Sequence, residues 1–158
     1  DIPGRSVIKM SDNTMAELAK NDLIVGVKDA TADLARPTRL QNLIGDNFIQ
    51  LSGEDGTALA YLAAGGHGCI SVTANIAPNL LSRMHNAWKQ GDITNAQDIN
   101  KKLMPLHDSL FCETSPGPLK YAASLLGLCN EVTRLPLSEI KDDTKQVVKN
   151  CLQELQLL

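Results

Sequence analysis

The first half of the chain alternates between short, continuous apolar runs and stretches with helical spacing. The apolar runs are rich in β-branched residues and span residues 23–28, 47–53 and 68–74. Continuous runs of this length are typical of parallel strands that are covered on both faces. The stretches around them, residues 12–21, 32–45 and 56–66, place apolar side chains three and four positions apart. The pattern predicts successive β/α units.

The expected helix ends carry the usual local signals. Ser11 precedes the first helix as an N-cap, with Asp12 in the first turn. Pro37 lies near the start of the second helix and Gly45 follows its end, which is the common asymmetry of helix termini. The Gly-Gly-His-Gly of residues 65–68 ends a helix and precedes a strand, so we interpret it as a helix stop and a turn.

The pattern changes after Ala74, beyond which no further strand is predicted. Helical spacing continues through four stretches, residues 79–91, 95–113, 117–128 and 142–158. We therefore expect β/α units over residues 1–91 and a helical domain over residues 92–158. Parallel strands joined by single helices permit a doubly wound sheet or a (β/α)₈ TIM barrel. No Gly-x-Gly-x-x-Gly follows a strand, which weakens the nucleotide-binding alternative.

Composition narrows the class of protein. The chain has 43% hydrophobic residues, a net charge of −3 and dispersed basic residues, so a nucleic-acid or membrane-surface partner is not expected. No stretch reads as a signal peptide or a membrane span. The chain begins with Asp1 instead of Met, which suggests that a preceding part is missing.

The cysteine pattern indicates a reducing compartment and no metal site. The four cysteines are far apart and form no Cys-x-x-Cys pair, as expected for reduced thiols in the cytoplasm. His67 and Cys69 are the only neighbouring His/Cys residues, and two ligands are too few for zinc. We expect neither a metal nor another cofactor.

A single lysine is the main candidate for chemistry. Lys28 ends the first apolar run, and barrel enzymes place their chemistry at the carboxyl ends of strands. Strand alternation puts Val25 and Val27 on one face, which we expect under the helices, and Gly26 and Lys28 on the other. Enclosure favours the neutral amine, which can attack a ketone to form an imine, with Gly26 leaving room for the stem. The alternative is an exposed lysine paired with a nearby aspartate.

Several motifs together resemble a known family. In this order, the segments DIPGRS, IVGVKDATADL, LSGEDGTAL, GGHGCISVTANIAP, KLMPLHDSLF and SPGPLKYA are similar to the C-terminal half of dihydrodipicolinate synthases. The resemblance covers essentially the whole chain. It implies the second half of a TIM barrel followed by a helical domain. It also implies a cytoplasmic lyase of lysine (diaminopimelate) biosynthesis that condenses pyruvate with aspartate-semialdehyde, with a homotetrameric assembly.

The resemblance also assigns roles to four residues. Lys28 matches the lysine that forms the Schiff base with pyruvate, and Ile70 matches a position whose backbone carbonyl lies beside the bound pyruvate. Arg5 matches the arginine that receives the carboxylate of the aldehyde substrate, a task suited to its planar donors. Gly53 falls in a loop where backbone contacts to substrate are expected.

Part of the family pattern has no counterpart in this sequence. The Gly-x-Thr-Thr-Gly-Glu loop that binds the pyruvate carboxylate is absent, and the proton-relaying tyrosine would immediately precede Asp1. Two other functions therefore stay open. One is a related pyruvate aldolase that cleaves sialic acid or a keto-deoxy sugar, against which Arg5 argues. The other is an inactive, truncated fragment.

Overall fold

The computed structural model describes all residues 1–158, and their contacts divide the chain into two compact units. Unit 1 is Asp1–Ser71 and unit 2 is Val72–Leu158. This division falls before the expected boundary at residue 91, because helix α5 (Pro78–Lys89) packs extensively on helix α6 (Ile93–Ser109). The expected boundary between the barrel part and the helical domain at residue 91 depends on where the barrel ends, and it stays a prediction.

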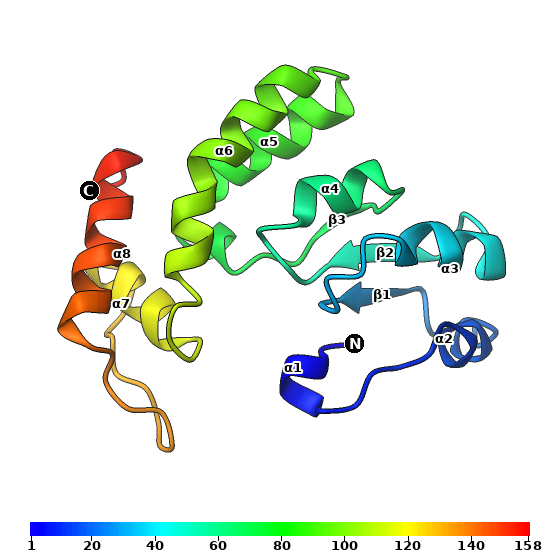
Figure 1. Cartoon of the computed structure of the whole chain (residues 1–158), viewed down its shortest axis with the longest axis horizontal. Helices are drawn as coiled ribbons and strands as arrows, with labels where there is room; N and C mark the ends of the chain where they lie inside the picture. The colour runs from blue at the N-terminus through cyan, green and yellow to red at the C-terminus, as the bar shows by residue number, and fades with distance from the viewer. The chain divides into compact units, whose positions relative to one another are not determined.

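Unit 1 contains three parallel strands that alternate with helices. The strands lie in the order β1-β2-β3, and the arrows of β1 and β2 point the same way in Figure 1. The helices include the N-capped helix after Ser11, whose hydroxyl accepts a hydrogen bond from Thr14 N at 3.1 Å. The predicted β/α alternation is therefore confirmed. The elements are α1 (Pro3–Ser6), α2 (Asp12–Leu18), β1 (Gly26–Asp29), α3 (Arg36–Ile44), β2 (Ile49–Ser52), α4 (Ala58–Ala63) and β3 (Gly68–Cys69).

The strands are shorter than the apolar runs predicted. The third run reaches residue 74, but β3 ends at Cys69 and a 3₁₀ helix, η1, covers Thr73–Asn75. In the first run Val27 is buried, at 8% exposure, as expected. Val25 is 66% exposed, so the prediction that both valines pack under helices was wrong for Val25. Val25 lies before the start of β1, and only its carbonyl joins the sheet, by accepting from Ile49 N at 2.9 Å.

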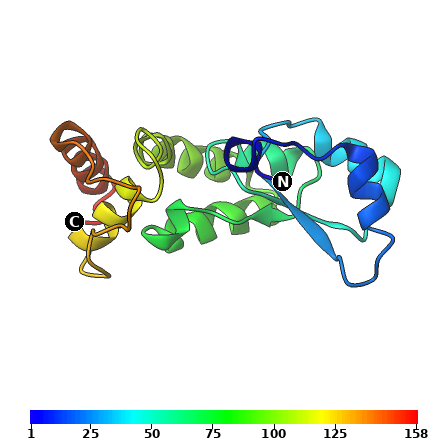
Figure 2. The same cartoon turned by 90° about the horizontal axis from the view of Figure 1, so that it is seen from below.

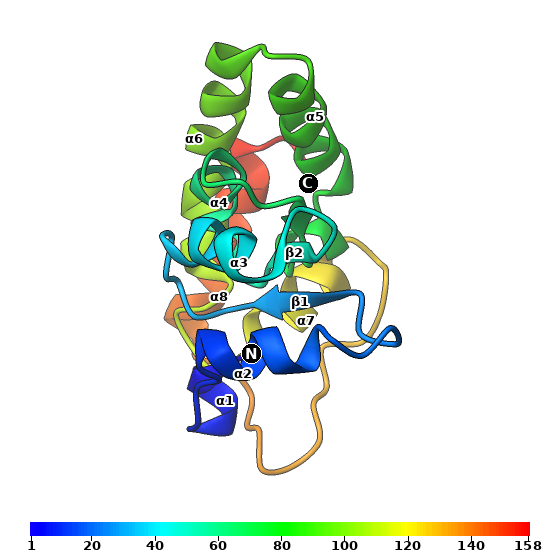
Figure 3. The same ribbon diagram turned by 90° about the vertical axis from the view of Figure 1, so that its right-hand side faces the viewer.

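The small apolar core of unit 1 lies on one face of the sheet. Its buried members come from α2, β1, α3 and the residue that precedes β2, and α2 and α3 contact each other. Figure 3 labels these elements. The members are Met15, Val27, Leu40 and Phe48. This core fixes the face of β1 that carries Val27, so Lys28, the next residue, projects from the opposite face.

Unit 2 is entirely helical and has a larger core. Helices α5 and α6 run side by side in Figures 1 and 3, and α6 and α7 (Gly117–Leu125) each contact α8 (Asp142–Glu154). The long connection from α7 to α8 is drawn in yellow to orange in Figure 2. The four predicted helices are thus confirmed. The fully buried core residues, each at 0% exposure, include Met84, Leu103, Leu106, Leu110, Val148 and Leu152.

Candidate active site

Lys28 lies near the carboxyl end of β1. Its neighbours across the sheet are Leu51 of β2 and then Gly68 of β3, which places the three residues in one row. Side chains in such a row share one face of the sheet. The side chain of Lys28 is half-buried, on the face opposite Val27. The predicted position at the carboxyl edge of a parallel sheet is confirmed.

The space beside the Lys28 side chain comes from Gly53. A Cβ atom added at Gly53 would lie 2.9 Å from Lys28 Cε and 2.8 Å from Ala30 Cβ. The expectation that Gly26 provides this space was wrong. A Cβ at Gly26 would instead meet the carbonyl oxygen of Ile49 at 2.3 Å. Gly26 therefore permits the close approach of β1 to β2, and Gly53 permits the lysine stem to pass.

The loop that carries Gly53 is held by hydrogen bonds from both sides. Gly53 N donates to the carbonyl of Asp29 at 2.6 Å, which ties the loop to the end of β1. The Ser52 hydroxyl accepts from Glu54 N at 3.1 Å and donates to Glu54 O at 2.9 Å. These bonds span Gly53 and fix its backbone next to Lys28.

Ile70 extends the same edge of the sheet. Its backbone N–H donates to the carbonyl of Ser52 at 2.8 Å, so the backbone continues the β2–β3 ladder by one bond beyond Cys69. The Ile70 side chain is 46% exposed. The ends of β1, β2 and β3 thus bring three predicted site residues, Lys28, Gly53 and Ile70, to one edge.

The fourth predicted site residue, Arg5, is exposed on α1. This single turn ends at Val7, whose φ of 66° reverses the chain direction, and the Ser6 hydroxyl donates to the carbonyl of Ile8 at 2.8 Å. The segment begins at Asp1, which is hydrogen-bonded to the end of β1. Arg5 therefore lies on a segment that is anchored next to Lys28.

Polar residues that the sequence reasoning did not select gather near Lys28. The Ser71 hydroxyl donates a short hydrogen bond to the carboxylate of Asp55, which is 2% exposed. Burial raises the pKa of Glu54, and the Asp55 charge adds to that effect. Burial also raises the pKa of the Cys69 thiol to about 12, although the Lys28 charge opposes the shift. The signal in the sequence was the Gly-Glu-Asp of residues 53–55, of which we selected only the glycine.

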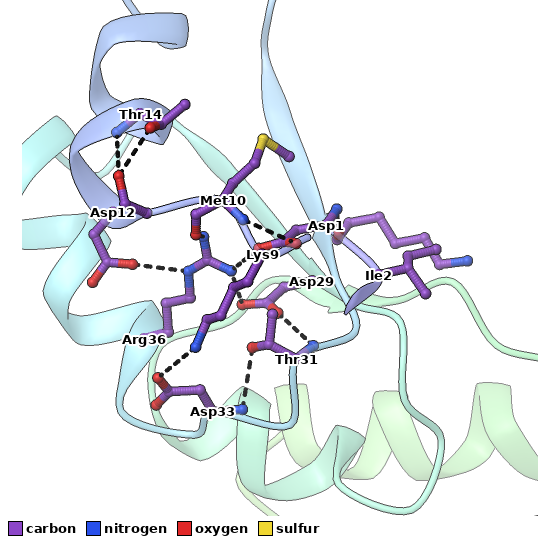
Figure 4. A network of polar contacts seen from close by, with 12 residues as sticks. Asp1, Ile2, Lys9, Met10, Asp12, Thr14, Asp29, Thr31, Asp33 and Arg36 are labelled. Carbon is purple, nitrogen blue, oxygen red and sulfur yellow. Dashed lines mark hydrogen bonds and ion pairs between the residues drawn. The ribbon is translucent and has the colours of Figure 1, made fainter. Parts of the chain in front are cut away.

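A buried arginine contacts several polar groups on the face of β1 opposite Lys28 (Figure 4). Arg36 is 0% exposed, and its Nη1 lies 2.6 Å from Asp1 Oδ2. Its Nε lies 2.9 Å from Asp12 Oδ1, and its Nη2 donates to the carbonyl of Met10 at 3.0 Å. The buried carboxylate of Asp29 is 3.6 Å from Nη1. We did not identify this cluster from sequence, because its members are far apart in the chain.

The side chains of the chain offer no place for a bound metal. No group of three or more His, Cys, Asp or Glu residues could hold an ion. His67 instead accepts a hydrogen bond at Nδ1 from Gln50 N at 3.1 Å, in addition to the bond from its own N–H to the Gln50 carbonyl. None of the helices has both the length and the apolar composition that a membrane span requires.

A parallel β/α fold with a lysine at the carboxyl edge of its sheet is the arrangement of (β/α)₈ enzymes. The model of the dihydrodipicolinate synthetase family matches residues 1–155, so the chain belongs to this family.

Curated relatives and solved structures agree with the family match. A 4-hydroxy-tetrahydrodipicolinate synthase of Rhodospirillum centenum is 58% identical over 158 residues, covering 100% of this chain and 54% of the relative. The corresponding enzyme of Acidiphilium cryptum is 56% identical over 158 residues, with 100% and 54% coverage. The dihydrodipicolinate synthase structure from Thermotoga maritima superposes with a TM-score of 0.95 at 33% identity, covering 100% of this chain and 55% of that one.

The chain thus spans about half the length of the curated relatives it matches. The shared fold with these solved enzymes establishes the three β/α units as a partial TIM-barrel arrangement. These figures give the share of each relative and not the position within it, so the expected placement in the C-terminal half stays a prediction.

Proposed function

We propose that this chain carries the imine-forming lysine of a 4-hydroxy-tetrahydrodipicolinate synthase. The observation that carries the proposal is the position of Lys28 at the carboxyl end of β1, with its stem beside Gly53, in a chain of this family. A related structure from Acinetobacter baumannii, 35% identical with a TM-score of 0.93 and covering 100% of this chain and 54% of that one, is described as complexed with pyruvate. Pyruvate is therefore the keto acid we assign to Lys28.

The proposed reaction begins with the Lys28 amine attacking the ketone carbon of pyruvate, and water leaves as the imine forms. The protonated imine withdraws electrons from the methyl group, which loses a proton to give an enamine. The enamine carbon then attacks the aldehyde of aspartate-semialdehyde. Hydrolysis of the new imine releases the product and restores Lys28.

The other three site residues have supporting roles in this proposal. Gly53 leaves space for the lysine stem and for the bound keto acid. The backbone carbonyl of Ile70 lies beside the pyruvate moiety. Arg5 binds the carboxylate of aspartate-semialdehyde through its planar, doubly hydrogen-bonding guanidinium. A sugar-cleaving aldolase would not need this arginine, so substrate choice separates the two activities.

Trapping the imine tests the proposal directly. The full-length protein that carries this chain is incubated with pyruvate, reduced with borohydride and digested, and the adduct is located by mass spectrometry. We expect the adduct on Lys28, and none in the Lys28→Arg variant. An adduct on another lysine, or no adduct, contradicts the mechanism. Faster turnover of pyruvate, without borohydride, with a sugar aldehyde than with aspartate-semialdehyde would favour the sugar lyase instead.

We propose further that the enzyme is a cytoplasmic homotetramer that takes part in lysine biosynthesis. The support is the family membership and the four cysteines, which are all free. Light scattering of the full-length protein tests the assembly. A monomer with full activity would contradict it.

A further inference from the structure

We propose that Arg36 is a positioning residue that holds the nucleophile Lys28 and the segment bearing Arg5 in a fixed mutual arrangement. The inference rests on the proposed function, because it assigns Arg36 a part in the same site. It concerns a residue that would not touch either substrate.

Arg36 binds both ends of the segment that contains Arg5. Its Nη1 contacts the Asp1 carboxylate at 2.6 Å, and its Nη2 donates to the carbonyl of Met10 at 3.0 Å. Met10 N also donates to the Asp1 carboxylate at 3.4 Å. One buried side chain thus closes residues 1–10 into a loop. Figure 4 shows Asp1 and Met10 on neighbouring sides of the guanidinium.

The same side chain is connected to the strand end that carries Lys28. Asp1 N donates to the carbonyl of Lys28 at 2.8 Å, and Ala30 N donates to the carbonyl of Asp1 at 2.9 Å. These two bonds go to the residues before and after Asp29, as in a parallel ladder. The Asp29 carboxylate lies 3.6 Å from Arg36 Nη1, and it also accepts from Thr31 N at 2.9 Å. Arg36 therefore contacts residues on both sides of this pairing.

Only an arginine can make this set of contacts. The guanidinium is planar and presents its N–H groups in fixed directions, whereas a lysine offers one compact charge on a flexible stem. Arg36 uses Nε, Nη1 and Nη2 on three different partners, in α2, in residue 1 and at residue 10. A lysine at this position would keep the charge but lose the simultaneous contacts. The segment and the strand end could then shift relative to each other.

Helix α3 supplies a matched control in Arg39. This residue also binds Asp12, at 2.7 Å, and it binds Asp33 at 2.7 Å. It therefore shares one carboxylate with Arg36 and lies on the same helix. Its contacts include neither Asp1 nor the Met10 carbonyl. Replacing Arg39 changes the charge network without opening the loop that carries Arg5.

The test compares Arg36→Lys with Arg39→Lys in the full-length protein. We expect Arg36→Lys to raise KM for aspartate-semialdehyde and to slow pyruvate trapping on Lys28, each by about tenfold, the change that corresponds to about 1.4 kcal/mol. Arg39→Lys should stay within about twofold on both. A purely structural role would lower the folded fraction and the apparent kcat, but would leave KM and the trapping rate per folded site unchanged.

A second variant keeps the test decisive where Arg36→Lys does not fold. Asp29→Asn keeps an acceptor for Thr31 N but removes the charge that faces Arg36. We expect it to slow trapping on Lys28 by about threefold, in the same direction as Arg36→Lys. If Arg36→Lys folds, a wild-type KM and trapping rate in that variant would overturn the inference. If only Asp29→Asn folds, a wild-type trapping rate in Asp29→Asn would overturn it. No Lys28 adduct in the unsubstituted protein would instead overturn the proposed function, so the two failures are distinguishable.

Discussion

The two units of the chain are stabilised by different kinds of interaction. Unit 2 buries a large, mainly aliphatic cluster contributed by all four of its helices and by Ile76 and Ala77, which follow η1. Unit 1 has a core cluster of four buried residues, and next to it a fully buried arginine surrounded by carboxylates. Apolar packing is non-directional, whereas charge-assisted hydrogen bonds hold their partners at defined angles. The unit that carries the proposed chemistry is thus the one with a buried cluster of charge-assisted, directional contacts.

This difference in buried contacts predicts which amino-acid substitutions each unit tolerates. A buried ion cluster contributes little net stability compared with apolar residues of the same volume, but removing one partner leaves the others buried and uncompensated. An aliphatic core loses stability in proportion to the volume removed. Unit 1 should therefore be sensitive to single polar substitutions, and unit 2 to cavities.

The largest expected effect is that of Arg36→Met in unit 1. It leaves the buried carboxylates of Asp1 and Asp29 without their cation, which should cost about 3–5 kcal/mol. Hydrogen exchange of the full-length protein should show faster exchange in β1, α2 and α3. Arg39→Met, at an exposed arginine whose ion pairs are screened by solvent, should cost much less. Equal costs for both variants would contradict the assignment of Arg36 as the centre of the cluster.

The next effect is a cavity in unit 2. Leu103→Ala removes a fully buried side chain from α6 and should cost about 2–5 kcal/mol. Exchange should accelerate in α5, α6 and α8 and stay unchanged in β1 and β2. Leu128→Ala is the control, because Leu128 is 63% exposed and little packing is lost. Faster exchange spreading equally through unit 1 would show that the two cores are not independent.

A smaller effect, on chemistry instead of stability, is expected from Gly53→Ala. The new methyl group would press on Lys28 Cε and Ala30 Cβ, so trapping of pyruvate on Lys28 should slow by about tenfold, as for an interaction of about 1.4 kcal/mol. Gly4→Ala serves as the control, because nothing lies within 4 Å of a Cβ atom there. An unchanged trapping rate in Gly53→Ala would mean that the lysine stem moves freely.

The smallest expected effect is on the acid sensitivity of unit 1. Burial alone would raise the pKa of Asp12, but hydrogen bonds and charge from Arg39 and Arg36 outweigh it, and the pKa is lowered. A carboxyl whose pKa is lower in the folded state stabilises the protein above its unfolded pKa, and that stability is lost as pH falls through the folded value. Asp12→Asn should therefore flatten the loss of stability of unit 1 below about pH 4.

Urea unfolding followed by exchange in α2 and α3 measures this change. Asp98→Asn, on the exposed surface of α6, is the charge-matched control and should leave the pH dependence of unit 1 unaltered. A steeper acid dependence in Asp12→Asn would contradict the sign worked out above.

The sequence predicted the order and type of the helices and strands because local signals specify them. Ser11, Pro37 and Gly45 mark helix ends in the structure as they do in the sequence. Strand length was less predictable. The third apolar run continues past Cys69, but the backbone turns into η1, so apolar composition alone did not reveal where pairing with β2 stops.

The candidate site was predictable only where strand geometry determines it. Alternation along β1 separates Lys28 from Val27, and this is observed. The glycine beside the lysine was assigned to Gly26 within the strand, whereas the contact comes from Gly53, after the neighbouring strand. Arg36 was not selected from the sequence, because its partners precede it by up to 35 positions in the chain. Such contacts depend on the tertiary fold and produce no periodic pattern of residues in the sequence.

The separation of the two cores also bears on how this chain can diverge. Aliphatic residues of the helical unit can exchange one for another while their summed volume is kept, so drift there can proceed in single steps. The carboxylates that surround Arg36 cannot be exchanged in single steps, because all of them pair with the same guanidinium. A combinatorial library built on this scaffold should therefore randomise the helical interior freely and vary the Arg36 set only as a block.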